Sequence, residues 1–125
     1  MRAPSIHNTQ PWRFGFRLGT RTVTVHADRS RSLALADPVG RALHLSTGSA
    51  VFNLRVAAAH LGWRPVTHLL PDPADPDLLA TVQLTVPDTT APDYRTLYAA
   101  VARRHSSRMP FTGRPVPERI VADMA

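Results

Sequence analysis

The longest regular element of this chain is predicted in residues 39–62, with the sequence VGRALHLSTGSAVFNLRVAAAHLG. Apolar residues recur in it close to the 3.6-residue period of an α-helix, at positions 39, 42, 43, 50, 51, 54, 57, 58 and 61. Asp37 and Pro38 precede this segment, and both residue types favour the start of a helix. Gly62 supplies a stop. We therefore predict a central helix of about 23 residues, roughly 35 Å long.

Short strands are predicted on both sides of this helix. Residues 12–18 alternate apolar side chains with Arg and Gly. After a Gly19-Thr20 turn, Val23 and Val25 alternate with Thr22, Thr24 and His26, and the two segments together indicate a hairpin. The other expected elements are strands at 66–70 and 78–86, helices at 94–104 (capped by Asp93) and 118–125, and loops at 71–77 and 104–117. The predicted fold is α+β, with an antiparallel hairpin and short strands around a long central helix.

Composition excludes several classes of site. The chain has no Cys, which rules out disulfides, thiolate zinc sites and a cysteine nucleophile. Its six His residues have no spacing typical of a metal site with a carboxylate ligand. No apolar run approaches the roughly 18 residues of a membrane span, and the first residues lack the apolar stretch of a secretory signal. We expect a cytoplasmic protein that makes no membrane contact.

The net charge of +6 raises the question of a polyanion partner. All 15 basic residues are Arg, a residue type that binds phosphate backbones when it is clustered. Here the arginines are spread from Arg2 to Arg119, and no predicted helix face collects them. We therefore expect no nucleic-acid partner, although a basic nucleic-acid-binding module stays as a distant alternative.

The most informative segment is PSIHNTQPW, residues 4–12. It holds several compact polar side chains between two prolines, immediately before an aromatic strand. Such a loop can present hydrogen-bond donors and acceptors at fixed positions, as the rim of a polar ligand site does. Ordinary turn chemistry explains the same composition, because Asn, Ser and Pro are common turn residues.

This segment resembles the flavin-binding loop of the nitroreductase superfamily. Its longer form, APSIHNTQPWRF, is similar to the Acg-type branch, in which two nitroreductase-like halves are fused in one chain. Three further segments resemble the same branch in the expected order, namely residues 36–65, 69–84 and 103–111. The resemblance therefore covers almost the whole chain.

The resemblance implies FMN as cofactor and NAD(P)H as reductant. The residues that it assigns to FMN binding are Pro4, Ser5, Asn8 and Gln10 in the first loop, and Arg104, Ser106 and Arg108 in an Arg-x-Ser-x-Arg segment that holds the phosphate. Two guanidinium groups and a hydroxyl can saturate phosphate oxygens, whereas without the resemblance Arg104 and Arg108 would be interpreted as a solvated helix end. Asn53 is interpreted as a helix-packing residue. No catalytic side chain is assigned, because the isoalloxazine ring carries the hydride.

The function predicted from this resemblance is FMN-dependent hydride transfer from NAD(P)H to nitro-aromatic or quinone-like acceptors. A non-catalytic flavin-sequestering protein, or an inactive remnant of the same family, is the alternative. Residues 1–102 would form the first nitroreductase-like half without its first helix, and residues 103–125 the start of a truncated second half. We expect this chain alone to bind FMN weakly or not at all, and to be inactive. Exposed apolar faces of the long helix would favour self-association or a companion polypeptide.

Overall fold

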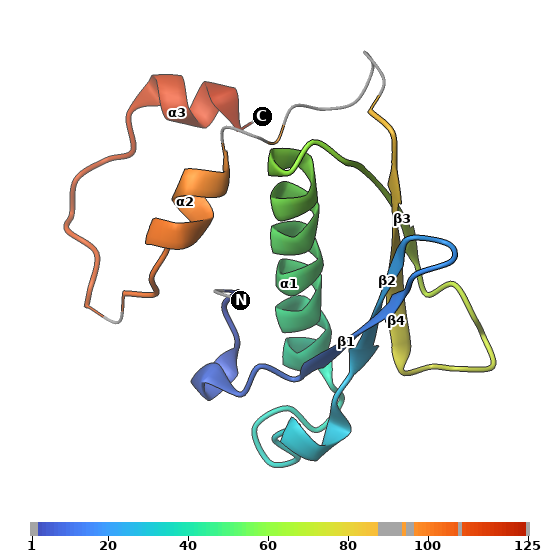
Figure 1. Ribbon diagram of the computed structural model, residues 1–125. Helices are drawn as coiled ribbons and strands as arrows, with labels where there is room; N and C mark the ends of the chain where they lie inside the picture. The colour runs from blue at the N-terminus through green and yellow to red at the C-terminus, as the bar shows by residue number, and fades with distance from the viewer. Residues whose placement is uncertain (1–2, 88–93, 95–96, 108, 125) are drawn as a thin grey trace.

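The computed structural model of the protein describes residues 3–87, 94, 97–107 and 109–124. The four strands form one antiparallel sheet in the order β1-β2-β4-β3, and the long helix α1 lies across one face of it (Figure 1). The elements in chain order are η1 (Ile6–Asn8), β1 (Trp12–Arg17), β2 (Thr22–Ala27), η2 (Arg29–Arg31), α1 (Arg41–His60), β3 (Arg64–Leu69), β4 (Leu78–Thr85), α2 (Tyr98–Arg103) and α3 (Glu118–Asp123). This arrangement confirms the predicted α+β fold.

The predicted hairpin is formed by β1 and β2. Phe14 pairs with Val25 and Phe16 with Val23, so these aromatic residues share the face of the sheet that carries the buried valines. Val25 is fully buried, whereas Phe16 is 55% exposed because β1 is an edge strand. The apolar positions of the hairpin therefore face α1, and the helix covers them least at the β1 edge.

The core lies between α1 and the middle of the sheet. One buried cluster joins Ala50 and Val51 of α1 to Ala3 of the N-terminal segment and to four strand residues, Trp12, Val25, Ala80 and Val82. Ala50 and Ala80 have no exposed surface, and their small side chains let the helix approach the sheet closely. Because Ala3 and Trp12 belong to this cluster, the core anchors both ends of the loop that precedes β1.

The start of α1 is shifted from its predicted position. The helix begins at Arg41 after Gly40, which has a left-handed φ of 72°. Asp37 caps it from upstream, because its two carboxylate oxygens accept the N–H groups of Ala42 and Leu43 at 3.0 and 2.8 Å. Asp37 and Pro38 therefore do mark a helix start, but a turn that the sequence pattern does not predict separates the cap from the first helical residue.

The predicted stop at Gly62 is confirmed, and its geometry is a Schellman motif. Gly62 has a φ of 82°. Its N–H donates to Ala59 O at 3.0 Å, and the N–H of Trp63 donates to Ala58 O at 2.9 Å. A left-handed residue after Leu61 ends the helix and directs the chain into β3.

Acid should destabilise the protein through two capping aspartates. The N–H of Ala42 is the main cause that holds the pKa of Asp37 below its usual value of 3.8, and the Ser30 hydroxyl similarly lowers the pKa of Asp28. A lowered folded-state pKa gives stability that is present above the unfolded pKa and lost as the pH falls through the folded value. We expect the melting temperature to fall between about pH 5 and pH 2, with a shallower slope in Asp37→Asn. Equal slopes for both proteins would contradict the role of Asp37.

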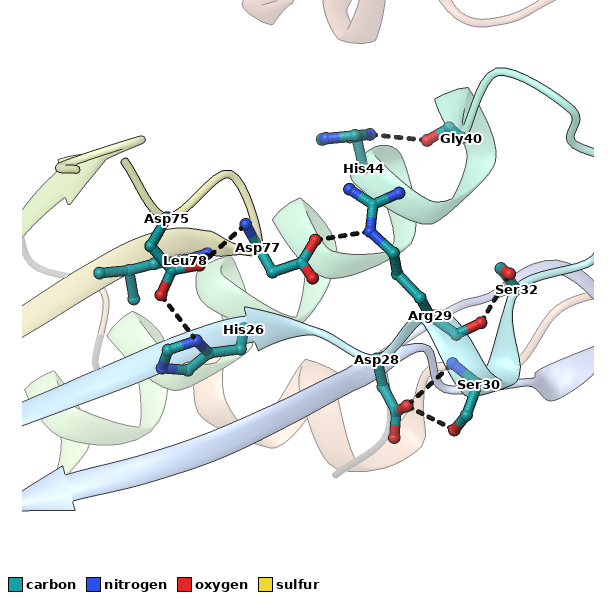
Figure 2. Close-up of polar contacts among 10 residues, drawn as sticks. All are labelled: His26, Asp28, Arg29, Ser30, Ser32, Gly40, His44, Asp75, Asp77 and Leu78. Atoms are coloured by element: carbon teal, nitrogen blue, oxygen red, sulfur yellow. Dashed lines mark hydrogen bonds and ion pairs between the residues drawn. The ribbon is translucent and has the colours of Figure 1, made fainter. Parts of the chain in front are cut away.

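The loop between β3 and β4 is tied to the end of β2 by polar contacts (Figure 2). Arg29 Nε lies 2.6 Å from Asp77 Oδ1, and His26 Nδ1 lies 3.9 Å from Asp75 Oδ2. The N–H of Ala27 also donates to Asp77 O at 2.8 Å. The loop at 71–77, predicted to be irregular, is thus irregular but attached to β2.

Helix α2 packs on the side of α1 that faces away from the sheet (Figure 1). The rings of His60 and Tyr98 stack with their centroids 4.0 Å apart, and this contact packs α2 against α1. The helix predicted at 94–104 is shorter than expected, since α2 covers Tyr98–Arg103, and its predicted cap Asp93 lies outside the described residues. All described side chains from residue 105 onward are exposed. The boundary predicted after residue 102, between a first and a second nitroreductase-like half, stays a prediction. No helix within the described ranges is long and apolar enough to cross a membrane.

Candidate functional site

The loop before β1 has a fixed and strained backbone. Ser5 Oγ accepts the N–H of Gln10 at 3.0 Å, and Ser5 O accepts the N–H of Asn8 at the same distance. His7, Asn8 and Gln10 all have positive φ values, of 47°, 57° and 50°. Such conformations cost non-glycine residues about 1–2 kcal/mol each, so they persist only where the surroundings determine them. Here the anchoring of Ala3 and Trp12 in the core provides that constraint.

A cavity of about 550 Å³ lies where this loop, α1 and α2 meet. Its volume falls in the range of small-molecule sites, roughly 300–1,000 Å³. Three parts of the chain line it: Pro4 from the loop, Gly48, Ser49, Phe52 and Asn53 from α1, and Leu97, Ala100, Val101 and Arg104 from α2 and its flanks. The small residues on α1 leave the space, because a Cβ at Gly48 would meet no atom within 4 Å. We call this space the α1–α2 cavity.

The polar groups of the α1–α2 cavity are few. Among the described residues that line it, Arg104 alone is charged. Asn53 is 7% exposed, and its Nδ2 finds no hydrogen-bond partner in the part of the chain that the structure describes. A buried donor without a partner is costly, by about 1–3 kcal/mol. The cavity therefore combines apolar walls with one cation, and the amide nitrogen of Asn53 is buried beneath its wall.

The structure brings some of the predicted FMN-binding residues together. Pro4, from the loop before β1, and Arg104, from the C-terminal end of α2, line the same cavity. Ser106 Oγ accepts a hydrogen bond from Arg104 Nη1 at 3.1 Å. Ser5 lines a neighbouring cavity of about 230 Å³, which shares Pro4 and Ser49 with the larger one.

Other predicted residues are not placed at these cavities. Asn8 and Gln10 lie in the strained loop but are not among the residues that line either space. Arg108 lies outside the described residues. The assignment of these seven residues to FMN stays a prediction.

Sequence reasoning missed the contribution of α1 to the cavity. Ser49, Phe52 and Asn53 lie at the three- and four-residue spacing of one helix face, which a helical projection could have revealed. Asn53 was interpreted as a packing residue, and it is indeed buried, but it also lines the cavity. No group of three or more His, Asp or Glu residues that could hold a metal occurs among the described residues.

Comparison with known proteins gives relatives over nearly the whole chain. No family model matches. "Putative NAD(P)H nitroreductase Rv3131" of Mycobacterium tuberculosis is 42% identical over 127 residues, which cover 100% of this chain and 36% of that protein. "Putative NAD(P)H nitroreductase acg" of the same organism is 34% identical over 114 residues, or 91% of this chain and 34% of that protein. "Uncharacterized protein Rv3127", also from that organism, is 36% identical over 112 residues, which cover 88% of this chain and 33% of that protein.

These matches confirm the family suggested by the sequence motifs. The chain spans about a third of the length of the curated relatives it matches, and its sheet with a long helix is consistent with a nitroreductase-like half-domain. Over that length, this chain is a homologue of the proteins named as NAD(P)H nitroreductases, Acg among them.

Proposed function

We propose that this chain contributes to an FMN-dependent NAD(P)H oxidoreductase, and that the α1–α2 cavity receives part of the FMN. One observation carries the proposal. Pro4 and Arg104 lie far apart in the sequence, each matches a position implied to contact FMN, and both line a single cavity. The relatives named as nitroreductases support the same class of reaction.

The chemistry of the cavity suits the two ends of this cofactor. Arg104 and Ser106 offer a guanidinium and a hydroxyl to a phosphate, and such charge-assisted hydrogen bonds are stronger than neutral ones. Phe52, Leu97 and Val101 offer apolar surface to a flat ring system. When bound, the flavin would take a hydride from NAD(P)H and pass it to a nitro-aromatic or quinone-like acceptor. The residues of this chain would bind the phosphate, orient the ring and exclude water.

Arg104 should make binding depend on the phosphate of FMN. We expect the chain to bind FMN weakly, with a dissociation constant above about 1 µM, because one cavity buries only part of such a ligand. It should still bind FMN about tenfold more tightly than riboflavin, which lacks the phosphate, since tenfold corresponds to about 1.4 kcal/mol. Arg104→Gln should abolish this preference. Flavin fluorescence titrations with FMN and with riboflavin measure this preference.

The matched control is Arg114→Gln, which removes an exposed arginine that does not line the cavity. This variant should keep the preference for FMN. Equal affinities of the unaltered chain for FMN and riboflavin would contradict the phosphate role of Arg104. A submicromolar affinity for FMN would contradict our expectation that the chain holds only part of the site.

Flavin binding without turnover is the second candidate function. It rests on the same observation, because Pro4 and Arg104 at one cavity support flavin binding and supply nothing specific to hydride transfer. Anaerobic addition of NADPH to the flavin-loaded chain separates the two candidates. Bleaching of the flavin absorbance supports the oxidoreductase, and an unchanged spectrum supports sequestration.

A further inference from the structure

Strand β1 is an edge of the sheet, since it pairs with β2 on one side only. One residue beyond this pairing, the N–H of Asp28 donates to Pro11 O at 3.0 Å. Hydrogen-bonded pairs alternate along an antiparallel ladder with pairs that are not bonded, so the same register makes Arg13 a bonded residue and Phe14 and Phe16 unbonded ones. The N–H and C=O groups of Phe14 and Phe16 therefore point outward, and no described residue accepts either N–H. Such a row of groups is a template for a further strand.

The two sides of this edge differ in chemistry. Phe14 and Phe16 lie on the side that faces α1, and they are 41% and 55% exposed because the helix covers the edge incompletely. Arg13 and Arg17 lie on the opposite side, where both are exposed and flank Gly15. An incoming strand would therefore meet aromatic rings on one side and guanidinium groups on the other.

The charges of these two arginines are not compensated within the described part of the chain. Neither Arg13 nor Arg17 forms an ion pair there. The Ser30 hydroxyl is the main cause of the lowered pKa of Asp28, and Arg13 contributes less to it, but the ion pair of Asp28 is with Arg31 at 3.4 Å. The whole chain also carries a net charge of +6. The arginine side of the edge therefore favours acidic residues on the strand that binds it.

A second copy of this chain fits the β1 edge poorly. If two β1 strands paired antiparallel with Phe14 opposite Phe16, Arg13 of each copy would lie opposite Arg17 of the other. Like charges directly opposite each other destabilise a pair of strands. A shift of the register by two residues still leaves arginines diagonal to one another, within reach of long side chains. The edge therefore favours a different polypeptide, of opposite charge.

We propose that β1 binds an extended acidic segment of a partner protein, which adds to the sheet as an antiparallel strand. Acidic residues of the partner would lie opposite Arg13 and Arg17, and apolar residues opposite Phe14 and Phe16. The residues opposite Phe14 and Phe16 would exchange backbone hydrogen bonds with β1. The pairs at Arg13 and Arg17 would not be hydrogen-bonded, and side chains come closest in pairs of that type, so the ion pairs form there. The proposal does not depend on flavin binding, since no residue of β1 lines the α1–α2 cavity.

The probe is a nine-residue peptide with Glu opposite Arg13 and Arg17, Val opposite Phe14 and Phe16, and Thr at all other positions. Chemical-shift titration of the full chain should give a dissociation constant of about 0.1–1 mM, with the largest shifts at the amides of β1. The same peptide with Lys in place of Glu should bind at least about tenfold more weakly, because two attractive pairs become repulsive. Single-stranded DNA of ten nucleotides, at the same salt concentration, should also bind more weakly than the Glu peptide.

N-methylation of the peptide tests strand addition separately from charge. Methyl groups on the two Val nitrogens remove the donors that would reach the C=O groups of Phe14 and Phe16, and should abolish binding. A methyl group on the nitrogen of the Thr opposite Gly15 points away from β1, and should be tolerated. Both methylated peptides keep the charges of the original.

Arg17→Gln should weaken binding of the Glu peptide about threefold, through the loss of one ion pair. The matched control is Arg114→Gln, which makes the same change of charge at an exposed arginine outside the sheet, and should leave the affinity unchanged. Four outcomes would overturn the proposal: equal binding of the Glu and Lys peptides, equal binding of the two methylated peptides, DNA that binds as tightly as the Glu peptide, or equal losses in the two arginine variants.

Discussion

Replacement of Trp12 by alanine is expected to destabilise the protein by about 3–5 kcal/mol, the usual cost of truncating a buried tryptophan. Trp12 is 7% exposed and belongs to the main core cluster together with Val25 and Ala50. Small domains have unfolding free energies of about 5–15 kcal/mol, so this loss leaves little stability. Urea unfolding followed by far-ultraviolet circular dichroism measures it. Fluorescence is less suitable, because the substitution removes one of only two tryptophans.

The matched control for this prediction is Phe16→Ala on the same strand. Phe16 shares the helix-facing side of β1 but is 55% exposed, so its truncation removes far less buried surface. We expect a loss below about 1 kcal/mol. A loss as large as that of Trp12→Ala would show that the edge of the sheet is covered more fully than the structure indicates. Trp12 also anchors one end of the strained loop before β1, so its truncation should let the loop leave its positive-φ conformation.

Leu43→Ala is expected to cost about 2–5 kcal/mol. Leu43 is 3% exposed and forms a second buried cluster with Ala27 and Leu79, where the first turn of α1 meets the ends of β2 and β4. Truncation leaves a cavity that Ala27 and Leu79 cannot fill without moving. The midpoint of urea unfolding should therefore decrease, with an unchanged slope if the transition stays two-state.

Leu45→Ala provides the comparison within the same helix turn. Leu45 is 64% exposed, on the side of α1 away from the sheet. Its truncation should change the unfolding free energy by no more than about 0.5 kcal/mol. Equal effects of the two leucine substitutions would mean that α1 is rotated about its axis relative to the sheet, contrary to the packing described above.

Local signals predicted most of the fold. The alternation in residues 12–18, the helical period of residues 39–61 and the stop at Gly62 all depend on neighbouring residues, and each is present in the structure. The errors occur where a non-local contact or a side-chain contact determines where an element begins or ends. Asp37 caps α1 through side-chain bonds to residues five and six positions ahead, so the helix starts later than its apolar pattern suggests.

The candidate sites were less predictable than the fold. Pro4 and Arg104 were assigned to FMN by resemblance, and only the packing of α2 on α1 places both at one cavity. Which residues of α1 line that cavity depends on the rotation of α1 over the sheet and on the position of α2. Neither quantity is encoded by a short segment of sequence.

The order β1-β2-β4-β3 also affects how this protein can assemble. β3 is an edge strand, and its second residue is Pro65, which has no N–H to offer. An incoming chain would meet a gap in the row of donors at that end of the strand, which discourages growth of the sheet into fibrils. Strand addition to this sheet is therefore disfavoured at β3 relative to β1, the other edge strand, which contains no proline.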